Sequence, residues 1–534
     1  MIFPASYWLR VLLHLCAVGL FTVSLASGLR LAVDGEWLLA DLWARISPQG
    51  NVIAWHLAAG GGWVMLGITV LGALKKKPWK TQVRKSAGVI IRGIYLALPV
   101  QIAAGIWLYF GITGSGWVLT LHYWLAMVLS AVVLCHVVEQ LIAKKGRHLP
   151  AVFIPTRLSR FSLRSLLLGV GALLSTGIAV VMLWWGSSAG YQNLYISPLD
   201  EHSRIQIDGA ATESAWSSAS AETVVTTQGN DYQRSVPVEV RALANAYTVY
   251  LLISWPDPEP NYSHLPLQKT QQGWRVNHNG FERDDERSFY EDKLAVMISK
   301  GNGFGGDHSI HLGSTPLAGY PASRSGRGLH YTEDGTIRDV WHWKAVRGAD
   351  MSVLDDDYFG APEAACAFCS RYKAGYQPDP VEDGGVRQNW DWFRPGQVMP
   401  LRLPVLQVRN QEVTNQEVTN QEVRNQEIGS DVPGHAMAWY SSIPYSLSLD
   451  NIPVGAQLPS VIWMSHYEGD RGDVRGQAQW HDGRWTLELA RARDTGSPYD
   501  IALEDGVYMW VAPFDHAQTR HSYHHRPLRL RFAP

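Results

Sequence analysis

The sequence predicts a chain in two parts, a bundle of five transmembrane α-helices followed by a mostly antiparallel β-sandwich. Two observations carry this prediction. Apolar runs long enough to cross a bilayer are concentrated before residue 190, and almost all the acidic residues come after it. Beyond that point the chain changes to short alternating runs between turn residues, which is the pattern of half-buried strands. We therefore expect a helical domain at 1–190 and a β-domain at 191–534.

The average composition hides this division. The 534 residues are 46% hydrophobic and 18% charged, with a formal net charge of −2. Because there is no basic excess and no basic helix, we expect no nucleic-acid partner. The 23 tryptophans suit membrane interfaces, aromatic-rich β-structure or a ring-shaped ligand.

Five segments have about the 20 apolar residues that a helix needs to cross a bilayer. They are 8–29, 52–74, 89–111, 118–142 and 164–186. Loops 75–85 and 144–164 are strongly basic, and basic loops stay on the cytoplasmic side. We expect a multi-pass protein of a bacterial inner membrane, with its N-terminus cytoplasmic and its C-terminal domain periplasmic. The first segment resembles a signal peptide at LASG, but its long apolar run favours a retained helix.

Four histidines lie inside these segments. His122 and His136 share one helix face because fourteen residues are nearly four turns, or about 21 Å of rise. The orientation places His56 and His122 at the outer level, and His14 and His136 at the inner level. An intramembrane histidine is costly without a partner, and two facing imidazoles are what a six-coordinate haem iron needs. We predict that the two pairs hold two haem b groups; ordinary helix packing is the alternative.

This four-histidine set, with His122 and His136 spaced as H-x13-H, resembles the di-haem cytochrome b subunits of membrane-bound formate dehydrogenases and nickel-iron hydrogenases. The resemblance covers about residues 1–190. It implies electron transfer between quinone in the membrane and a redox partner at the outer face.

The second half contains several alternating runs that we expect to form strands. They are 239–255, 293–299, 484–492, 506–514 and 526–533. The pentad repeat VRNQE-VTNQE-VTNQE-VRNQE at 408–427 is of low complexity, and we interpret it as an expanded surface loop without chemistry.

Several phrases in this half are not generic. They are IDGAATESAW (207–216), YEDKLAVM (290–297), RDVWHWKAVR (338–347), Asp482-Gly483 before RWTLELAR, and FDHAQTRH (514–521). Together they resemble the haem-binding domain of the ethylbenzene dehydrogenase gamma subunit and its relatives in dimethyl sulfide dehydrogenase and selenate reductase, over about residues 200–534. The resemblance implies a β-sandwich that holds one haem b and exchanges electrons with a molybdenum enzyme outside the membrane.

In that family a Met and a Lys hold the iron. Met297 is our candidate for this Met. The alternative is that Met297 is an ordinary buried methionine of a strand. The Lys has no clear counterpart near the C-terminus, where the chain offers His521, His524 and His525 instead. We take His521 as the second axial candidate. A solvated turn or an adventitious metal site is the alternative for these three histidines.

Two further features of this half bear on haem. Cys366 and Cys369 form a C-x-x-C, but Ser370 stands where a covalent haem needs a histidine, so a local disulfide is favoured over a haem or metal role. His342 and Lys344 could border the haem, although core packing explains the flanking tryptophans equally well.

These observations predict a membrane-anchored multihaem cytochrome with two haem b groups in the bundle and a third in the exported domain. It would transfer electrons between the quinone pool and an extracytoplasmic redox enzyme or cytochrome, such as a molybdenum oxidoreductase. Because the chain has no nucleophile–base pair, phosphate loop or zinc signature, any catalysis is limited to quinone oxidation or reduction. The alternative is a membrane-tethered β-sandwich that binds a sugar or another small molecule and has no redox role.

Overall fold

The computed structural model describes residues 7–32, 52–73, 89–109, 115–142, 192–200, 203–227, 229, 235–281, 285–312, 328–348, 351–364, 372–394, 397–405 and 435–532. The chain divides into two compact units. The first is Met1–Tyr191 with Gly303–Gly328, and the second is Gln192–Asn302 with Leu329–Pro534. Three predictions fall outside the described residues: the fifth span at 164–186, the loop at 408–427, and the roles of Cys366 and Cys369.

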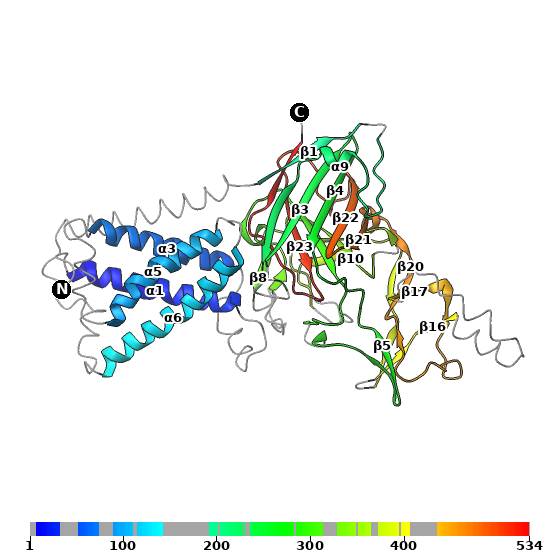
Figure 1. Ribbon diagram of the computed structural model, residues 1–534, viewed down its shortest axis with the longest axis horizontal. Helices are drawn as coiled ribbons and strands as arrows, with labels where there is room; N and C mark the ends of the chain where they lie inside the picture. Colours follow the sequence, from blue (N-terminus) through cyan, green and yellow to red (C-terminus); the bar gives the residue numbers. More distant parts are fainter. Residues whose placement is uncertain are drawn as a thin grey trace, which may run out of the picture. The chain divides into compact units, whose positions relative to one another are not determined.

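Four apolar helices make up the described part of the N-terminal region. They are α1 (Tyr7–Ala32), α3 (Val52–Ala73), α5 (Val89–Tyr109) and α6 (Ser115–Ile142). α1 packs against α3, and α5 packs against α6 (Figure 1). Each helix coincides with a predicted span, so the helical character of the N-terminal region is confirmed. The complete five-helix bundle stays a prediction.

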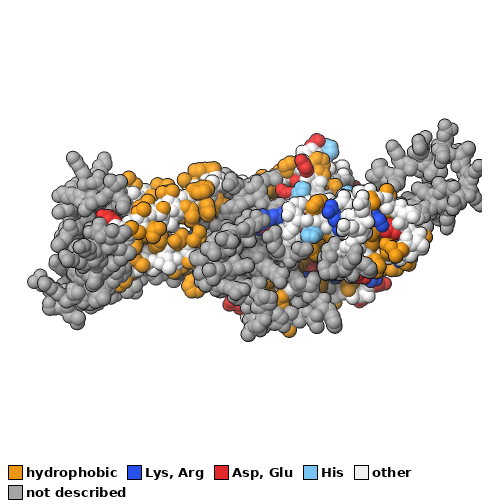
Figure 2. Space-filling model, turned by 90° about the horizontal axis from the view of Figure 1, so that it is seen from below, with side chains coloured by type: hydrophobic (Ala, Val, Ile, Leu, Met, Phe, Trp, Pro, Cys, Tyr) orange, Lys and Arg blue, Asp and Glu red, His pale blue; other side chains and the backbone are white. Residues whose placement is uncertain are grey.

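Two of these helices contain stretches that are long and apolar enough to cross a membrane, Leu13–Leu31 and Trp117–Glu139. Shorter apolar stretches occur at Val52–Ile68 and Leu96–Tyr109. Hydrophobic side chains cover the visible surface of the described helices in Figure 2. The exposed large hydrophobic residues of these helices include Trp55, Leu96, Trp117, Trp124 and Leu134. A surface of this kind suits a lipid environment, so length and composition support attachment to a membrane.

The second unit is built on a twelve-stranded sheet. Its strands in spatial order are β12 (Tyr376–Pro378), β11 (Asp355–Phe359), β10 (Arg338–Lys344), β7 (Lys293–Ser299), β23 (Tyr508–Phe514), β24 (Leu528–Phe532), β1 (Gln192–Pro198), β3 (Ser235–Ala244), β4 (Thr248–Pro256), β22 (Arg484–Ala492) and β21 (Arg475–His481), with β2 (Glu222–Thr227) paired to β3. The pairs are antiparallel except where β1 meets β24 and β3. The predicted mostly β character of this half is confirmed.

One predicted strand is a hairpin. The run 239–255 turns at Asn245, whose side-chain Oδ1 accepts hydrogen bonds from the backbone N–H groups of Tyr247 and Thr248 at 2.9 and 2.8 Å. An Asx turn of this kind ends β3 and starts β4.

The large sheet curls so that distant strands share one core. β4 and β10 are far apart in strand order, yet the ring centroids of Trp255 and Trp343 are 5.9 Å apart. Trp485 of β22 contacts both rings, at 6.3 and 4.8 Å. All three indoles are at most 2% exposed. The inward-facing residues of the curled sheet therefore form the core of a β-sandwich.

Shorter elements surround this sheet. Three smaller sheets contain β13 (Asp383–Gln388), β20 (Val461–Glu468) and β17 (Ala436–Ala438); β14 (Trp390–Arg394), β15 (Gln397–Pro400), β6 (Gly273–Val276), β5 (Leu267–Thr270) and β19 (Gln457–Leu458); and β16 (Arg402–Pro404) and β18 (Ser442–Pro444). The second unit also contains α9 (Ala215–Ser218), most of β9 (Gly328–His330), η4 (Trp439–Ser441) and η5 (Asp470–Gly472), whereas α10 (Phe304–Asp307) and β8 (Ile310–Leu312) belong to the first unit.

Candidate functional site

His56 of α3 and His122 of α6 lie side by side in the helical unit. Their ring centroids are 6.1 Å apart, and the ring planes are nearly perpendicular at 82°. Ser27 Oγ lies 2.9 Å from His56 Nδ1, and Gln101 Nε2 lies 3.2 Å from His122 Nε2. A metal bonded to both imidazoles through bonds of about 2 Å would fit between rings at this separation. The structure thus brings His56 and His122 together.

Two glycines make room for these imidazoles. A Cβ at Gly28 would lie 3.1 Å from His56 Cε1, and a Cβ at Gly105 would lie 3.2 Å from His122 Cε1. Both distances are tighter than ordinary van der Waals contact. Sequence reasoning did not single out either glycine, because each belongs to a different helix from the histidine that it faces.

His14 of α1 and His136 of α6 are close enough to interact electrostatically. The Nδ1 atom of His136 is buried and has no hydrogen-bond partner in the described part of the chain. The structure thus brings the four predicted histidines together as two pairs. Iron binding by either pair stays a prediction.

Six rings form a closed circuit of contacts on one face of the large sheet, which we call the histidine–aromatic cluster. Its members, in order around the circuit, are His330, Phe359, Tyr376, His342, Phe514 and His521. The successive centroid distances, ending with His521 back to His330, are 4.4, 5.5, 6.3, 5.4, 5.0 and 6.2 Å. Because three of the rings are imidazoles, the cluster combines stacking surfaces with nitrogen atoms that can bind hydrogen-bonding groups or a metal.

Strand register explains why these residues share a face. Met297 of β7 pairs with Val340 of β10 on one side and with Trp510 of β23 on the other. Residues two apart along a strand point to the same face. His342 and Phe514 therefore lie on the same face as Met297, each an even number of positions along its strand.

His342 is the most constrained of the three imidazoles. Its Nδ1 lies 3.1 Å from the hydroxyl of Tyr376, which donates a 2.8 Å hydrogen bond to Asp357 Oδ2. Its Nε2 is buried and lacks a hydrogen-bond partner among the described residues. Burial, assisted by Lys344 and Lys293, lowers the pKa of His342 well below its usual range. A neutral imidazole held in this way is the form that binds metals.

Of the two axial candidates from the sequence, His521 is a member of this cluster and Met297 lies beside it. Met297 packs with Phe359 and Trp510 in a small buried group. The His521 ring contacts Phe514 at 5.0 Å and His330 at 6.2 Å. The structure brings the two candidates to one region, and their binding to iron stays a prediction.

His524 also lies near the C-terminus, and both of its ring nitrogens lie within hydrogen-bond distance of backbone groups. Its Nε2 accepts a hydrogen bond from the N–H of Val511 at 2.9 Å, and its Nδ1 lies 2.6 Å from the carbonyl oxygen of Arg526. With both nitrogens engaged, His524 serves to hold β23 to the C-terminal segment. His525 packs edge-on against Tyr523 at 5.4 Å.

Charged side chains surround the histidine–aromatic cluster. Lys344 and Arg471 both pair with Asp355, and Arg471 Nε lies 2.5 Å from Asp355 Oδ1. Lys293 Nζ lies 4.0 Å from the ring centroid of Phe514 and donates a 2.9 Å hydrogen bond to the carbonyl of Gln518. Lys293 therefore places its ammonium group beside the aromatic surface, whereas Lys344 and Arg471 are paired with Asp355.

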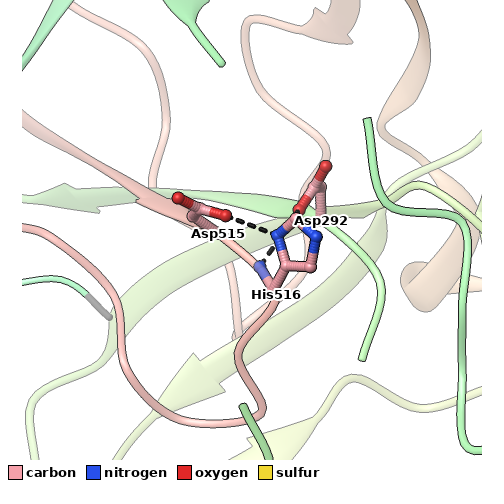
Figure 3. A group of neighbouring side chains, drawn as sticks. All are labelled: Asp292, Asp515 and His516. Atoms are coloured by element: carbon pink, nitrogen blue, oxygen red, sulfur yellow. Dashed lines mark hydrogen bonds and ion pairs between the residues drawn. The ribbon is translucent and has the colours of Figure 1, made fainter. Parts of the chain in front are cut away.

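Asp292, Asp515 and His516 converge at the ends of β7 and β23 (Figure 3). His516 Nδ1 lies 2.6 Å from Asp515 Oδ1, and the His516 backbone N–H donates to Asp292 Oδ1 at 3.1 Å. Asp292 Oδ2 accepts hydrogen bonds from the Asn261 N–H at 2.6 Å and the Trp485 indole at 3.3 Å. Because protein donors occupy both oxygens of Asp292, we interpret this group as a structural hub rather than a metal site.

The sequence motifs singled out above contribute residues to these sites. Those that contribute to the cluster and the hub are YEDKLAVM through Asp292, Lys293 and Met297, RDVWHWKAVR through His342 and Lys344, and FDHAQTRH through Phe514, Asp515, His516 and His521. A second meeting joins IDGAATESAW to RWTLELAR, where the Trp216 indole donates a 2.7 Å hydrogen bond to Glu488 Oε1. Sequence reasoning missed His330, Phe359 and Tyr376, because no local pattern distinguishes them from core residues.

Fold and cluster together define a class of protein, a β-sandwich with a ring of imidazole and aromatic side chains on its sheet, joined to apolar helices of membrane-spanning length. Within that class the chain belongs to the ethylbenzene dehydrogenase family, because the model of that family matches residues 213–526, more than half of the chain. This match confirms the resemblance of the second half. The di-haem cytochrome b resemblance of the first half is not shown by the comparisons, and no curated protein matches the chain.

Several solved structures are similar to the chain at low scores. A carbohydrate-binding module of family 9 from Caldicellulosiruptor kristjanssonii in complex with glucose has 7% identity and a TM-score of 0.24, covering 64% of this chain and 97% of the module. The same type of module in complex with cellotriose has 8% identity and a TM-score of 0.23, covering 64% and 95%. A putative carbohydrate-binding protein from Bacteroides uniformis has 9% identity and a TM-score of 0.26, covering 64% and 100%.

The predicted function requires correction. The sequence predicted a multihaem cytochrome that transfers electrons between the quinone pool and an extracytoplasmic partner, whereas the similar solved structures are carbohydrate-binding modules.

Proposed function

We propose that this chain is a membrane-anchored binding protein whose β-domain holds a small, flat ligand at the histidine–aromatic cluster. The observation that carries the proposal is the closed circuit of six rings, three of them imidazoles, on one face of the sheet. Aromatic faces stack on flat unsaturated molecules, and a few convergent polar groups set their orientation. Electron transfer is not part of this proposal.

Haem b, the cofactor that the family resemblance implies, is the ligand we propose for this site. The side chains present are of the types that hold haem iron, namely histidine and methionine. The buried Nε2 of His342, which lacks a partner among the described residues, supports the fit. Met297 and His521 are the residues that we propose would hold the haem, and His342 is a third candidate that the structure adds. When bound, the haem would supply an iron centre to this site.

The chain's own residues would bind and orient this ligand. Tyr376 and Asp357 fix the ring of His342 through consecutive hydrogen bonds. Lys293 lies over Phe514 and offers a positive charge to an acidic group on the ligand edge. Burial would exclude water from the face that the rings line.

For the helical unit we propose one haem b between His56 and His122 and another between His14 and His136. The 6.1 Å separation of the first pair and the glycines that face its rings support this assignment. The topology proposed from the basic loops keeps the N-terminus in the cytoplasm and the β-domain in the periplasm.

The proposal is tested by ligand titration of the full-length protein in detergent. In a His56→Ala/His136→Ala background, which removes one ligand of each helical pair, we expect ferric haem to bind the β-domain and to quench tryptophan fluorescence. A further His342→Ala replacement should weaken binding at least about tenfold, the effect of losing one contact of about 1.4 kcal/mol. His481→Ala is the control, because that side chain is 85% exposed. Binding of glucose or cellotriose without haem binding would contradict the assigned ligand.

A further inference from the structure

Five aspartates from separate segments meet inside the second unit, and we call them the buried carboxylate cluster. They are Asp339 of β10, Asp356 of β11, Asp379 directly after β12, Asp473 directly after η5, and Asp500 between β22 and β23. One oxygen from each of Asp339, Asp356 and Asp500 lies within 4.8 Å of the other two. Asp339 and Asp356 are 0% exposed and Asp379 is 2% exposed.

The protein compensates only part of this negative charge. Arg491 Nη2 lies 3.2 Å from Asp339 Oδ2 and 2.7 Å from Asp500 Oδ2. The backbone N–H of Ile501 donates a 3.0 Å hydrogen bond to Asp339 Oδ2. These contacts use one oxygen of each carboxylate and leave the Oδ1 atoms to the rest of the cluster.

Seven carboxylate oxygens of the cluster are buried and have no hydrogen-bond donor in the part of the chain that the structure describes. They are both oxygens of Asp356, both oxygens of Asp379, and the Oδ1 atoms of Asp339, Asp473 and Asp500. A buried carboxylate without a donor is strongly unfavourable, and several together repel one another. Asp356 and Asp379 are almost fully buried, and their carboxyl groups face other carboxyls of the cluster, Asp473 and Asp500 respectively. Buried carboxyls that face one another must share a proton or bind a cation, and the number of oxygens without another donor favours a cation.

We propose that the buried carboxylate cluster binds one Ca²⁺ ion. Calcium takes six to eight oxygen ligands in flexible geometry, which suits carboxylates contributed by five segments. Histidine and cysteine, which zinc and copper prefer, are not among the groups that form the cluster. The ion ties the β10–β11 pair to the segments that follow β12, η5 and β22.

The site is separate from the histidine–aromatic cluster, although both use β11. Asp356 pairs with Trp341, a core residue, and so points to the opposite face from Asp355 and Asp357. Calcium would therefore fix the strand that presents Asp357 and Phe359 to the ligand face. The proposal does not depend on which ligand occupies that face.

The test compares the full-length protein after EGTA treatment with and without added CaCl₂. We expect isothermal titration calorimetry to show one Ca²⁺ bound per chain. At free calcium a hundredfold above the dissociation constant, the unfolding midpoint of the β-domain should rise by about 5 °C. MgCl₂ should give a smaller rise, because Mg²⁺ demands six ligands in near-ideal octahedral geometry. Absence of both binding and a midpoint shift with calcium, or a larger shift with magnesium, would overturn the proposal.

Asp356→Asn is expected to affect the stability of the β-domain differently in EGTA and in CaCl₂. In EGTA it should be at least as stable as the wild type, because it removes one repelling charge, and in CaCl₂ it should gain no stability. A purely structural carboxylate would instead lower the midpoint in both conditions. Asp379→Asn is the second variant if the first does not fold, and Asp482→Asn is the control, because that side chain is 87% exposed. Calcium binding to both cluster variants at wild-type strength would refute the assignment.

Discussion

Replacing Glu291 with Ala is expected to destabilise the β-domain by about 3–5 kcal/mol, the usual cost of breaking a buried ion pair by removing one partner. Glu291 is 0% exposed. Its carboxylate accepts hydrogen bonds from the backbone N–H groups of Val346 and Arg347, pairs with the Arg347 guanidinium, and lies 3.1 Å from His264 Nδ1. Urea unfolding followed by tryptophan fluorescence measures the change in the free energy of unfolding.

Glu504→Ala is the matched control, because Glu504 is exposed and should change that free energy by less than about 0.5 kcal/mol. If Glu291→Ala lowers the free energy of unfolding no more than Glu504→Ala does, this ion pair does not hold β7 to the segment after β10.

Glu291 should also make the free energy of unfolding depend on pH. Burial alone would raise the pKa of Glu291, but Arg347 and His264 lower it well below its usual value of 4.5. A depressed carboxyl pKa contributes stability above the unfolded-state value, and that contribution is lost as the pH falls below about 4.5. Glu291→Gln should therefore flatten the decline in the free energy of unfolding between about pH 5 and pH 3. An unchanged slope would contradict the ion pair.

Replacing Glu488 with Ala is expected to cost about 3 kcal/mol, because buried donors lose a charged acceptor. Glu488 is 0% exposed, and its Oε2 accepts hydrogen bonds from the N–H groups of Gly209 at 2.8 Å and Asp208 at 3.2 Å. Its Oε1 accepts the Trp216 indole hydrogen bond at 2.7 Å. The free energy of unfolding, measured in urea, reports the loss. Glu488→Gln keeps an acceptor of the same size and should lose less; equal losses in both variants would point to charge rather than hydrogen bonding.

Local pattern predicted the described helices of this fold and several of its strands. Apolar runs marked the four described helices, and alternation marked strands such as β7 and β22. The sequence paired the four helical histidines by depth, because loop charge gives the direction of each helix, and the structure brings the members of each pair near one another. The hairpin at Asn245 was missed because the apolar alternation continues on both sides of the turn.

The sites of the β-domain depend on contacts that no local pattern records. His330 meets His521 only because the sheet brings β9 beside the segment after β23. The run Asp355-Asp356-Asp357 could not be assigned from the sequence for the same reason. Asp355 and Asp357 lie on the ligand face of β11, and Asp356 lies on the opposite face in the buried carboxylate cluster. That acidic run, unusual inside a strand, was the one signal in the sequence that could have drawn attention to the buried carboxylate cluster.

The most direct test of the central claim, that the histidine–aromatic cluster is a ligand site, is the number of haem groups per chain in the full-length protein. The measurement compares the wild type with His330→Ala/His342→Ala/His521→Ala, using His481→Ala as the control. We predict that the triple variant holds one haem fewer than the wild type and the control, while the helical histidines keep theirs. An equal haem count in all three proteins would contradict the account.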